Sequence, residues 1–99
     1  MTSIPDQLVL CVWRALLGEV FPNLRAIALS FRKKVLTIRY YVDGELTEPD
    51  QESIDFVLAG VSATMDIEVV EELKFECVAT RDPIGTVDPL DQLIFAKKE

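Results

Sequence analysis

The sequence predicts an α+β fold in which two helices pack on one face of a four-stranded, mostly antiparallel sheet. Two segments repeat apolar residues at helical spacing, and four shorter segments alternate apolar with polar residues as strands do. Their order is α-β-β-α-β-β. The alternation leaves the second face of the sheet partly solvated. With 99 residues, 49% of them hydrophobic, we expect a single domain over residues 1–99.

The first element is a predicted helix that ends near residues 18–20. Ser3 is a suitable N-cap, and Pro5 lies in the first turn, where a missing N–H is tolerated. Pro22 disfavours helical geometry at the residue before it. One broad apolar stripe is expected to face the core, tryptophan included; it comprises Val9, Val12, Trp13, Leu16, Leu17 and Val20.

Two strands of a predicted hairpin follow. Apolar residues alternate at positions 27, 29 and 31, and again at 36, 38, 40 and 42. The basic link at residues 32–34 joins them without the favoured Asn-Gly turn. Asp43 and Gly44 then turn the chain out of the sheet.

The second helix has the clearest sequence signals. Thr47 and Asp50 resemble a capping box, and Pro49 lies in the first turn. Carboxylates gather in that turn, where the helix dipole favours negative charge. The predicted buried face consists of Ile54, Val57, Leu58, Val61 and Met65.

Two further strands are predicted at residues 67–78 and 93–97. In the longer strand Glu71 falls on the inward side, so it needs a partner such as Arg25 or a bulge that turns it outward. The order of elements also matches a ferredoxin-like βαββαβ fold permuted to begin at its first helix.

Charge divides unevenly along the chain. Residues 1–42 carry a balance of +4 and residues 43–99 a balance of −11, which together give the net charge of −7. A strongly negative side repels nucleic acid and attracts basic proteins. The longest apolar stretch, residues 8–13, is far shorter than the roughly 20 residues of a membrane span. We therefore expect a protein partner, with neither nucleic acid nor membrane bound.

The sequence lacks the residues on which most catalysis depends. Histidine is absent, the glycines are scattered, and the serines lie in no nucleophile motif. Cys11 and Cys77 have no metal-ligand spacing and read as buried free thiols, which fits a reducing cytoplasm. No secretory signal is recognisable at residues 1–13. We expect a cytoplasmic protein that is not an enzyme and that needs no cofactor or metal.

Basic and aromatic residues on the predicted hairpin offer an opposing interpretation. Such residues together can bind nucleic acid through phosphate contacts and base stacking. The neighbouring acidic segment would repel the phosphates, which weakens this interpretation. The residues concerned are Arg32, Lys33, Lys34, Arg39 and Tyr41.

Two sequence segments resemble a known family. ALLGEVFPNLR at residues 15–25 and IRYYVDGE at residues 38–45 are similar to small bacterial immunity proteins that act against polymorphic toxins of the colicin and contact-dependent-inhibition type. Residues 95–99, FAKKE, resemble the end of those proteins as well. The resemblance implies a cytoplasmic inhibitor that binds one cognate toxin domain, often a nuclease, as a single copy.

We therefore predict an immunity protein that blocks a basic toxin, such as a nuclease domain, by stoichiometric binding through an acidic surface. The predicted contacts are Asp43, Glu45, Glu48, Asp50, Glu52 and Asp55, with Glu68, Glu72 and Glu76 as a second surface. Tyr41 and Phe56 are candidate aromatic anchors.

Three other interpretations stay open. The carboxylates can be a solvated surface with no partner. The chain can be a small scaffold domain that self-associates through Tyr41 and Val35 on the outer face of the hairpin. An enzyme with a carboxylate site is the third.

Overall fold

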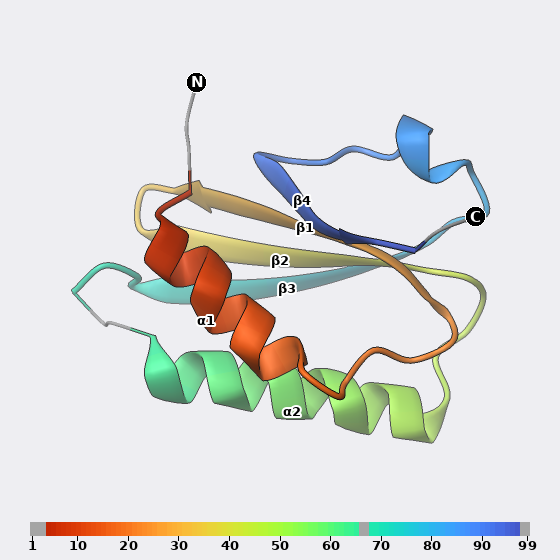
Figure 1. Cartoon of the computed structure of the whole chain (residues 1–99), viewed down its shortest axis with the longest axis horizontal. Coiled ribbons are helices and arrows are strands. Elements are labelled where there is room, and N and C mark those ends of the chain that lie inside the picture. Colours follow the sequence, from red (N-terminus) through yellow and green to blue (C-terminus); the bar gives the residue numbers. More distant parts are fainter. Residues whose placement is uncertain (1–3, 66–67, 98–99) are drawn as a thin grey trace.

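The computed structural model describes residues 4–65 and 68–97 and confirms the α+β prediction (Figure 1). Both helices lie on one side of a four-stranded sheet and share one core with it. The elements, in chain order, are α1 (Asp6–Leu16), β1 (Leu24–Arg32), β2 (Val35–Val42), α2 (Glu48–Thr64), β3 (Glu72–Ala79), the 3₁₀ turn η1 (Ile84–Thr86) and β4 (Gln92–Ala96).

The sheet has the order β3-β2-β1-β4 and is mixed. β1 runs antiparallel to both β2 and β4, whereas β2 and β3 are parallel. Parallel neighbours need a crossover connection, and α2 provides it. Because β2 and β3 are hydrogen-bonded neighbours, this βαβ unit is not split by another strand. The ferredoxin-like analogy, whose hallmark is a split βαβ unit, therefore does not hold.

α1 ends two to four residues earlier than predicted. Its last residue is Leu16, whose carbonyl accepts a hydrogen bond from the Glu19 N–H at 2.9 Å. Gly18 has a φ of +79°, a left-handed conformation that glycine adopts without strain and that commonly closes a helix. Pro5 precedes the first helical residue, and the predicted cap Ser3 lies outside the described residues.

The buried face of α1 is rotated relative to the prediction. Leu8, Val12 and Leu16, spaced four residues apart, face the core. The expectation that Trp13 belongs to the core is wrong, because its side chain is 41% exposed. α1 carries apolar residues on two adjacent stripes, and only one of them can contact the sheet and α2.

The cap and the buried face of α2 follow the sequence prediction. Thr47 and Asp50 form both hydrogen bonds of a capping box. Ile54, Val57 and Val61 are fully buried against the sheet. The predicted neighbours Leu58 and Met65 are partly buried on the edge of the same core.

The β1–β2 hairpin is confirmed, and its turn has an unusual composition. Only two residues, Lys33 and Lys34, separate the paired positions Arg32 and Val35. Their φ angles are 51° and 64°, the left-handed values that a type I′ turn requires and that Asn-Gly usually supplies. The turn geometry is therefore imposed on lysines that disfavour it.

β3 begins later than predicted, at Glu72, so Glu71 is not an inward residue of the strand. The Glu71 side chain is exposed and lies 3.8 Å from the Lys34 ammonium. Arg25 instead donates a hydrogen bond to the Thr80 carbonyl at 2.7 Å. Residue 67, the predicted start, lies outside the described residues. Cys77 is exposed, contrary to the buried-thiol prediction, while Cys11 is partly buried.

The second face of the sheet is more covered than the alternation suggests. Ala26, Ala28 and Tyr41 form a small second core there. The segment before β4 folds over them and contributes Ile84, Val87, Leu90 and Leu93. This face is therefore solvated only in part, as predicted, and the covering segment was not foreseen because a loop marked mainly by turn residues also carries apolar side chains.

Asp91 attaches this segment to the hairpin. Its carboxylate accepts hydrogen bonds from the Phe31 N–H at 3.0 Å and from the Arg32 guanidinium at 2.8 Å. The Asp91 side chain is only 6% exposed. The Arg32 hydrogen bond first, and the Phe31 N–H second, hold the pKa of Asp91 below its ordinary value.

Replacing Asp91 with asparagine is expected to lower the free energy of unfolding at neutral pH. A carboxylate whose pKa is lowered by folding adds stability above its ordinary pKa of about 4, and that stability is lost as the pH falls through the folded value. The difference between wild type and D91N should therefore narrow in acid. Chemical denaturation over a pH series measures it, with the exposed Asp82→Asn as control. A constant difference at all pH values would contradict the assignment.

Candidate interaction surface

Carboxylates crowd the start of α2, and we name this group the α2 rim. The chain leaves β2 through Gly44, whose φ of +80° makes the turn, and enters the helix at Glu48. Glu48 and Glu52 lie four residues apart on one helical stripe, with Asp55 beside them. The rim consists of the exposed residues Asp43, Glu45, Glu48, Glu52 and Asp55.

Asp50 was predicted to belong to this surface, but its environment is different. Its side chain is 7% exposed. The carboxylate accepts a hydrogen bond from the Thr47 N–H at 3.1 Å, while the Asp50 N–H donates to the Thr47 hydroxyl at 3.3 Å. Asp50 therefore completes the capping box of α2, and its burial leaves little of its carboxylate accessible to a partner.

The two predicted aromatic anchors occupy opposite environments. Tyr41 is 5% exposed, and its hydroxyl donates to the Asp88 carbonyl at 2.7 Å. That placement removes Tyr41 from the candidate anchors. Phe56 is 65% exposed and continues the stripe of Glu48 and Glu52. It borders a hollow of about 430 Å³ between the start of α2 and the α1–β1 connection, which Val20 and Glu52 also line.

The second predicted surface is largely compensated by neighbouring cations. Glu76 contacts the Arg39 guanidinium at 2.8 Å, and Glu72 lies 3.7 Å from the Lys74 ammonium. Glu68 is exposed and lies outside the strand that carries the other two. The structure therefore does not gather the three residues into one free anionic patch.

Most cations of the hairpin are paired with carboxylates from the second half of the chain. Arg32 pairs with Asp91, Lys34 with Glu71, and Arg39 with Glu76. Arg39 also donates to the Tyr41 hydroxyl at 3.2 Å. Their charge is thus used within the fold, which weakens the nucleic-acid interpretation.

The α2 rim is the exception to this pairing. Asp43 lies 3.3 Å from Arg81, an exposed pair of little energetic consequence. Asp55 accepts a hydrogen bond from Gln51 at 3.1 Å. Within the described part of the chain, Glu45, Glu48 and Glu52 take part in no ion pair. Uncompensated negative charge is therefore concentrated at the start of α2.

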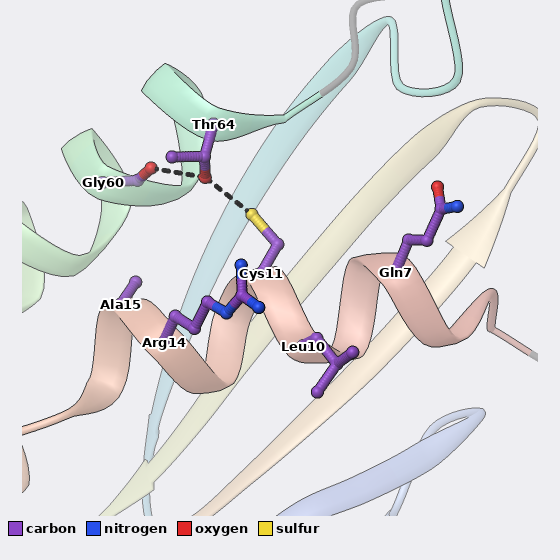
Figure 2. A pocket seen from close by; sticks show the side chains of 7 residues that line it. All are labelled: Gln7, Leu10, Cys11, Arg14, Ala15, Gly60 and Thr64. Atoms are coloured by element: carbon purple, nitrogen blue, oxygen red, sulfur yellow. Dashed lines mark hydrogen bonds between the residues drawn. The ribbon is translucent and has the colours of Figure 1, made fainter.

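A groove of about 440 Å³ separates α1 from α2 (Figure 2). Cys11 points from α1 toward Thr64 of α2, with a sulfur–oxygen distance of 2.9 Å. Because the Thr64 hydroxyl donates to the Gly60 carbonyl at 2.9 Å, it accepts the hydrogen of the thiol. Among residues 4–65 and 68–97, the side chains that line the groove include no carboxylate or imidazole that could act as a base for the thiol.

An apolar stripe on the outer side of α1 is exposed, although three of its four residues were predicted to face the core. Leu10, Trp13 and Leu17 are exposed at helical spacing, and Val20 follows in the connection. The sequence did indicate a second stripe, because the apolar residue Leu10 lies outside the stripe that was assigned to the core. Two overlapping apolar stripes on one short helix cannot both be buried, and periodicity alone does not say which one is.

Neither helix in the described part of the chain has the length and apolar character that a membrane-spanning segment requires. The sequence model of the MafI2 immunity protein family matches residues 5–99, nearly the whole chain. The chain belongs to the MafI2 immunity protein family. Membership confirms the resemblance to bacterial immunity proteins, gives the chain an immunity role and implies a cognate toxin as its partner. No curated protein matches the sequence significantly.

For this MafI2 family member, Asp50→Ala is expected to lower the free energy of unfolding by about 1 kcal/mol, because it removes the carboxylate that accepts the Thr47 N–H in the capping box of α2. Once folded, the variant should associate with the toxin at the wild-type rate. Asp55→Ala is the matched control, since it should leave stability within about 0.5 kcal/mol of wild type. Denaturation curves and stopped-flow association measure the two effects. Slower association of D50A at unchanged stability would assign Asp50 to the interface instead.

Proposed function

We propose that the protein neutralises its cognate toxin by stoichiometric binding, with the α2 rim facing a basic surface of the toxin. The observation that carries the proposal is the uncompensated charge of Glu45, Glu48 and Glu52 beside the exposed Phe56. Exposed carboxylates of this kind steer a positively charged partner and select it over others. Inhibition then requires binding alone and no catalysis by the immunity protein.

The toxin that fits this surface is a basic one, and a nuclease domain is the best candidate. A nuclease binds phosphates and therefore presents a cationic cleft. Carboxylates can occupy such a cleft in competition with the substrate. We place the encounter in the cytoplasm, where a nuclease toxin delivered by a neighbouring cell in contact-dependent growth inhibition meets its substrate.

Charge and apolar contact have separate roles in this proposal. Long-range attraction raises the association rate, while a few desolvated anchors supply most of the affinity. Phe56 is the anchor, because its ring stands exposed on the rim and borders a hollow that a partner side chain can enter. Glu68, Glu72 and Glu76 contribute at most to the general negative field.

The other interpretations have less support. Self-association through the outer face of the hairpin would need Tyr41, which is covered by residues 84–93, and Val35, which is mostly buried. An enzyme built on the rim carboxylates would need an apolar pocket that separates their proton affinities, and these side chains stand in solvent.

The double variant Glu48→Lys/Glu52→Lys is expected to slow association with the cognate toxin domain by about tenfold or more and to flatten its dependence on salt. Wild type should inhibit the toxin completely at one chain per toxin. Stopped-flow fluorescence measures the association rate and its salt dependence, and titration of toxin activity measures the stoichiometry of inhibition. Asp6→Lys/Glu71→Lys is the matched control, since it makes the same change in net charge away from the rim, at the start of α1 beside the far end of α2 and at the residue before β3. Equal slowing by both variants would show that only net charge matters.

Phe56→Ala is expected to raise the dissociation rate of the toxin complex by about tenfold or more while leaving the association rate nearly unchanged. Trp13→Ala is the control, because it truncates an exposed aromatic residue that lies on α1 and not on α2. Surface plasmon resonance resolves the two rates. If W13A accelerates dissociation and F56A does not, the contact lies on α1 and the rim is not its centre.

A further inference from the structure

β3 forms one edge of the sheet and is poorly covered. Leu73 and Phe75 are partly buried under the helices, whereas Cys77, Val78 and Ala79 are exposed. An open edge presents unpaired backbone N–H and C=O groups, a ready template for another strand. The last three residues of β3 are also uncharged, so their side chains do little to prevent this edge from pairing with another strand.

The hydrogen bonds to β2 identify which backbone groups are free. The Thr80 N–H donates to the Val42 carbonyl at 2.9 Å, and the Glu72 N–H to the Lys34 carbonyl at 3.3 Å. Even-numbered residues of β3 therefore point their backbone groups toward β2. Because the direction alternates along a strand, the odd-numbered residues point theirs to the free edge. These are Leu73, Phe75, Cys77 and Ala79.

Charges of both signs alternate on the sheet face that points away from the helices. Glu72, Lys74 and Glu76 share that face, and all three side chains are about half exposed. A row of one sign would repel a second copy of the same strand. A Glu-x-Lys-x-Glu row does not, provided that the register places unlike charges opposite each other.

One antiparallel register meets this condition while pairing most of the strand. Centring the pair on Leu73 would also place Lys74 opposite Glu72, but it would overlap only residues 72–74 of β3. With Phe75 opposite its own copy, each Lys74 lies opposite the Glu76 of the other chain, and each Glu72 lies opposite Val78. Centring the pair on Lys74 would instead place that lysine against itself and Glu72 against Glu76. Centring it on Glu76 would place that glutamate against itself. The Phe75 register also lets the free N–H and C=O of Phe75 bond to those of its copy.

We propose that the unbound protein forms a symmetric dimer through antiparallel pairing of β3 with β3 of a second copy, centred on Phe75. The pairing extends the four-stranded sheet to eight strands and makes two symmetry-related Lys74–Glu76 contacts. This goes beyond the proposed function, because the surface is the sheet edge and not the α2 rim. It also gives Lys74 a partner on another chain in place of the 3.7 Å contact with Glu72.

Sedimentation equilibrium of the purified full chain over a range of concentrations tests the proposal. Wild type should show a concentration-dependent monomer–dimer equilibrium. Glu76→Lys should weaken the dimer by about tenfold or more, because two pairs of opposite charge become two pairs of like charge. The swapped variant K74E/E76K should restore it. Glu48→Lys, with the same change in net charge, is the control and should dimerise as wild type does.

Spin labels on Cys77 then determine the register, in a Cys11→Ser background. From the rise of an antiparallel strand and the spacing between strands, the two Cys77 backbones lie about 14 Å apart in the Phe75 register. They lie about 20 Å apart if the pair is centred on Lys74 and about 8 Å apart if it is centred on Glu76. Dipolar broadening of the label spectrum distinguishes these cases.

Three results would overturn the proposal. A monomer at every concentration excludes the dimer. A dimer that Glu76→Lys leaves unchanged lies on another surface. Label distances matching another centre exclude the Phe75 register, even if the dimer uses this edge.

Discussion

The parallel pairing of β2 with β3 is the constraint on which the rest of the molecule depends. Two parallel neighbours cannot be joined by a tight turn, so the chain must cross the sheet between them, and α2 is that crossing. The helix consequently begins beside the end of β2, where Gly44 releases the chain. Its first turn collects carboxylates because the helix dipole stabilises them there. The same pairing leaves β3 at the margin of the sheet.

Electrostatic complementarity within the chain accounts for much of its uneven charge. The basic hairpin and the acidic second half are brought together by the sheet, and their side chains pair across it. Asp91 adds a main-chain contact to Phe31 and so fixes the segment that covers Tyr41. The start of α2 lies away from the hairpin cations, and its negative charge is left for a partner.

The sequence predicted the positions of the helices and strands better than it predicted which of their side chains are buried. Period-two and helical patterns located both helices and the β1–β2 hairpin, because burial on one face forces such patterns. They could not decide between the two apolar stripes of α1, so Trp13 was misplaced. They also could not foresee that residues 84–93 would fold over Tyr41, since a non-local contact leaves no local period. Asp50 shows the same limit at the site, because one carboxylate signal serves both a cap and a surface.

The strand order was equally hidden, because alternation within a strand does not name its neighbours. The parallel partner of β2 became evident only from the ladder between residues 35–42 and 72–79. The family resemblance, in contrast, could be recognised without knowledge of the fold, because it lies in the amino-acid sequence of residues 15–25 and 38–45. The immunity role was therefore easier to infer from the sequence than the surface that binds the toxin.

The two lysines in the hairpin turn have a consequence for how the chain folds. A turn that needs left-handed residues, and is given Lys33 and Lys34, gains little from closing by itself. The hairpin is then a poor candidate for an early local nucleus. α2, with its complete capping box, is the better starting point, and β2 and β3 can assemble around it. We expect the transition state for folding to be organised around that βαβ unit, with the lysine turn closing late.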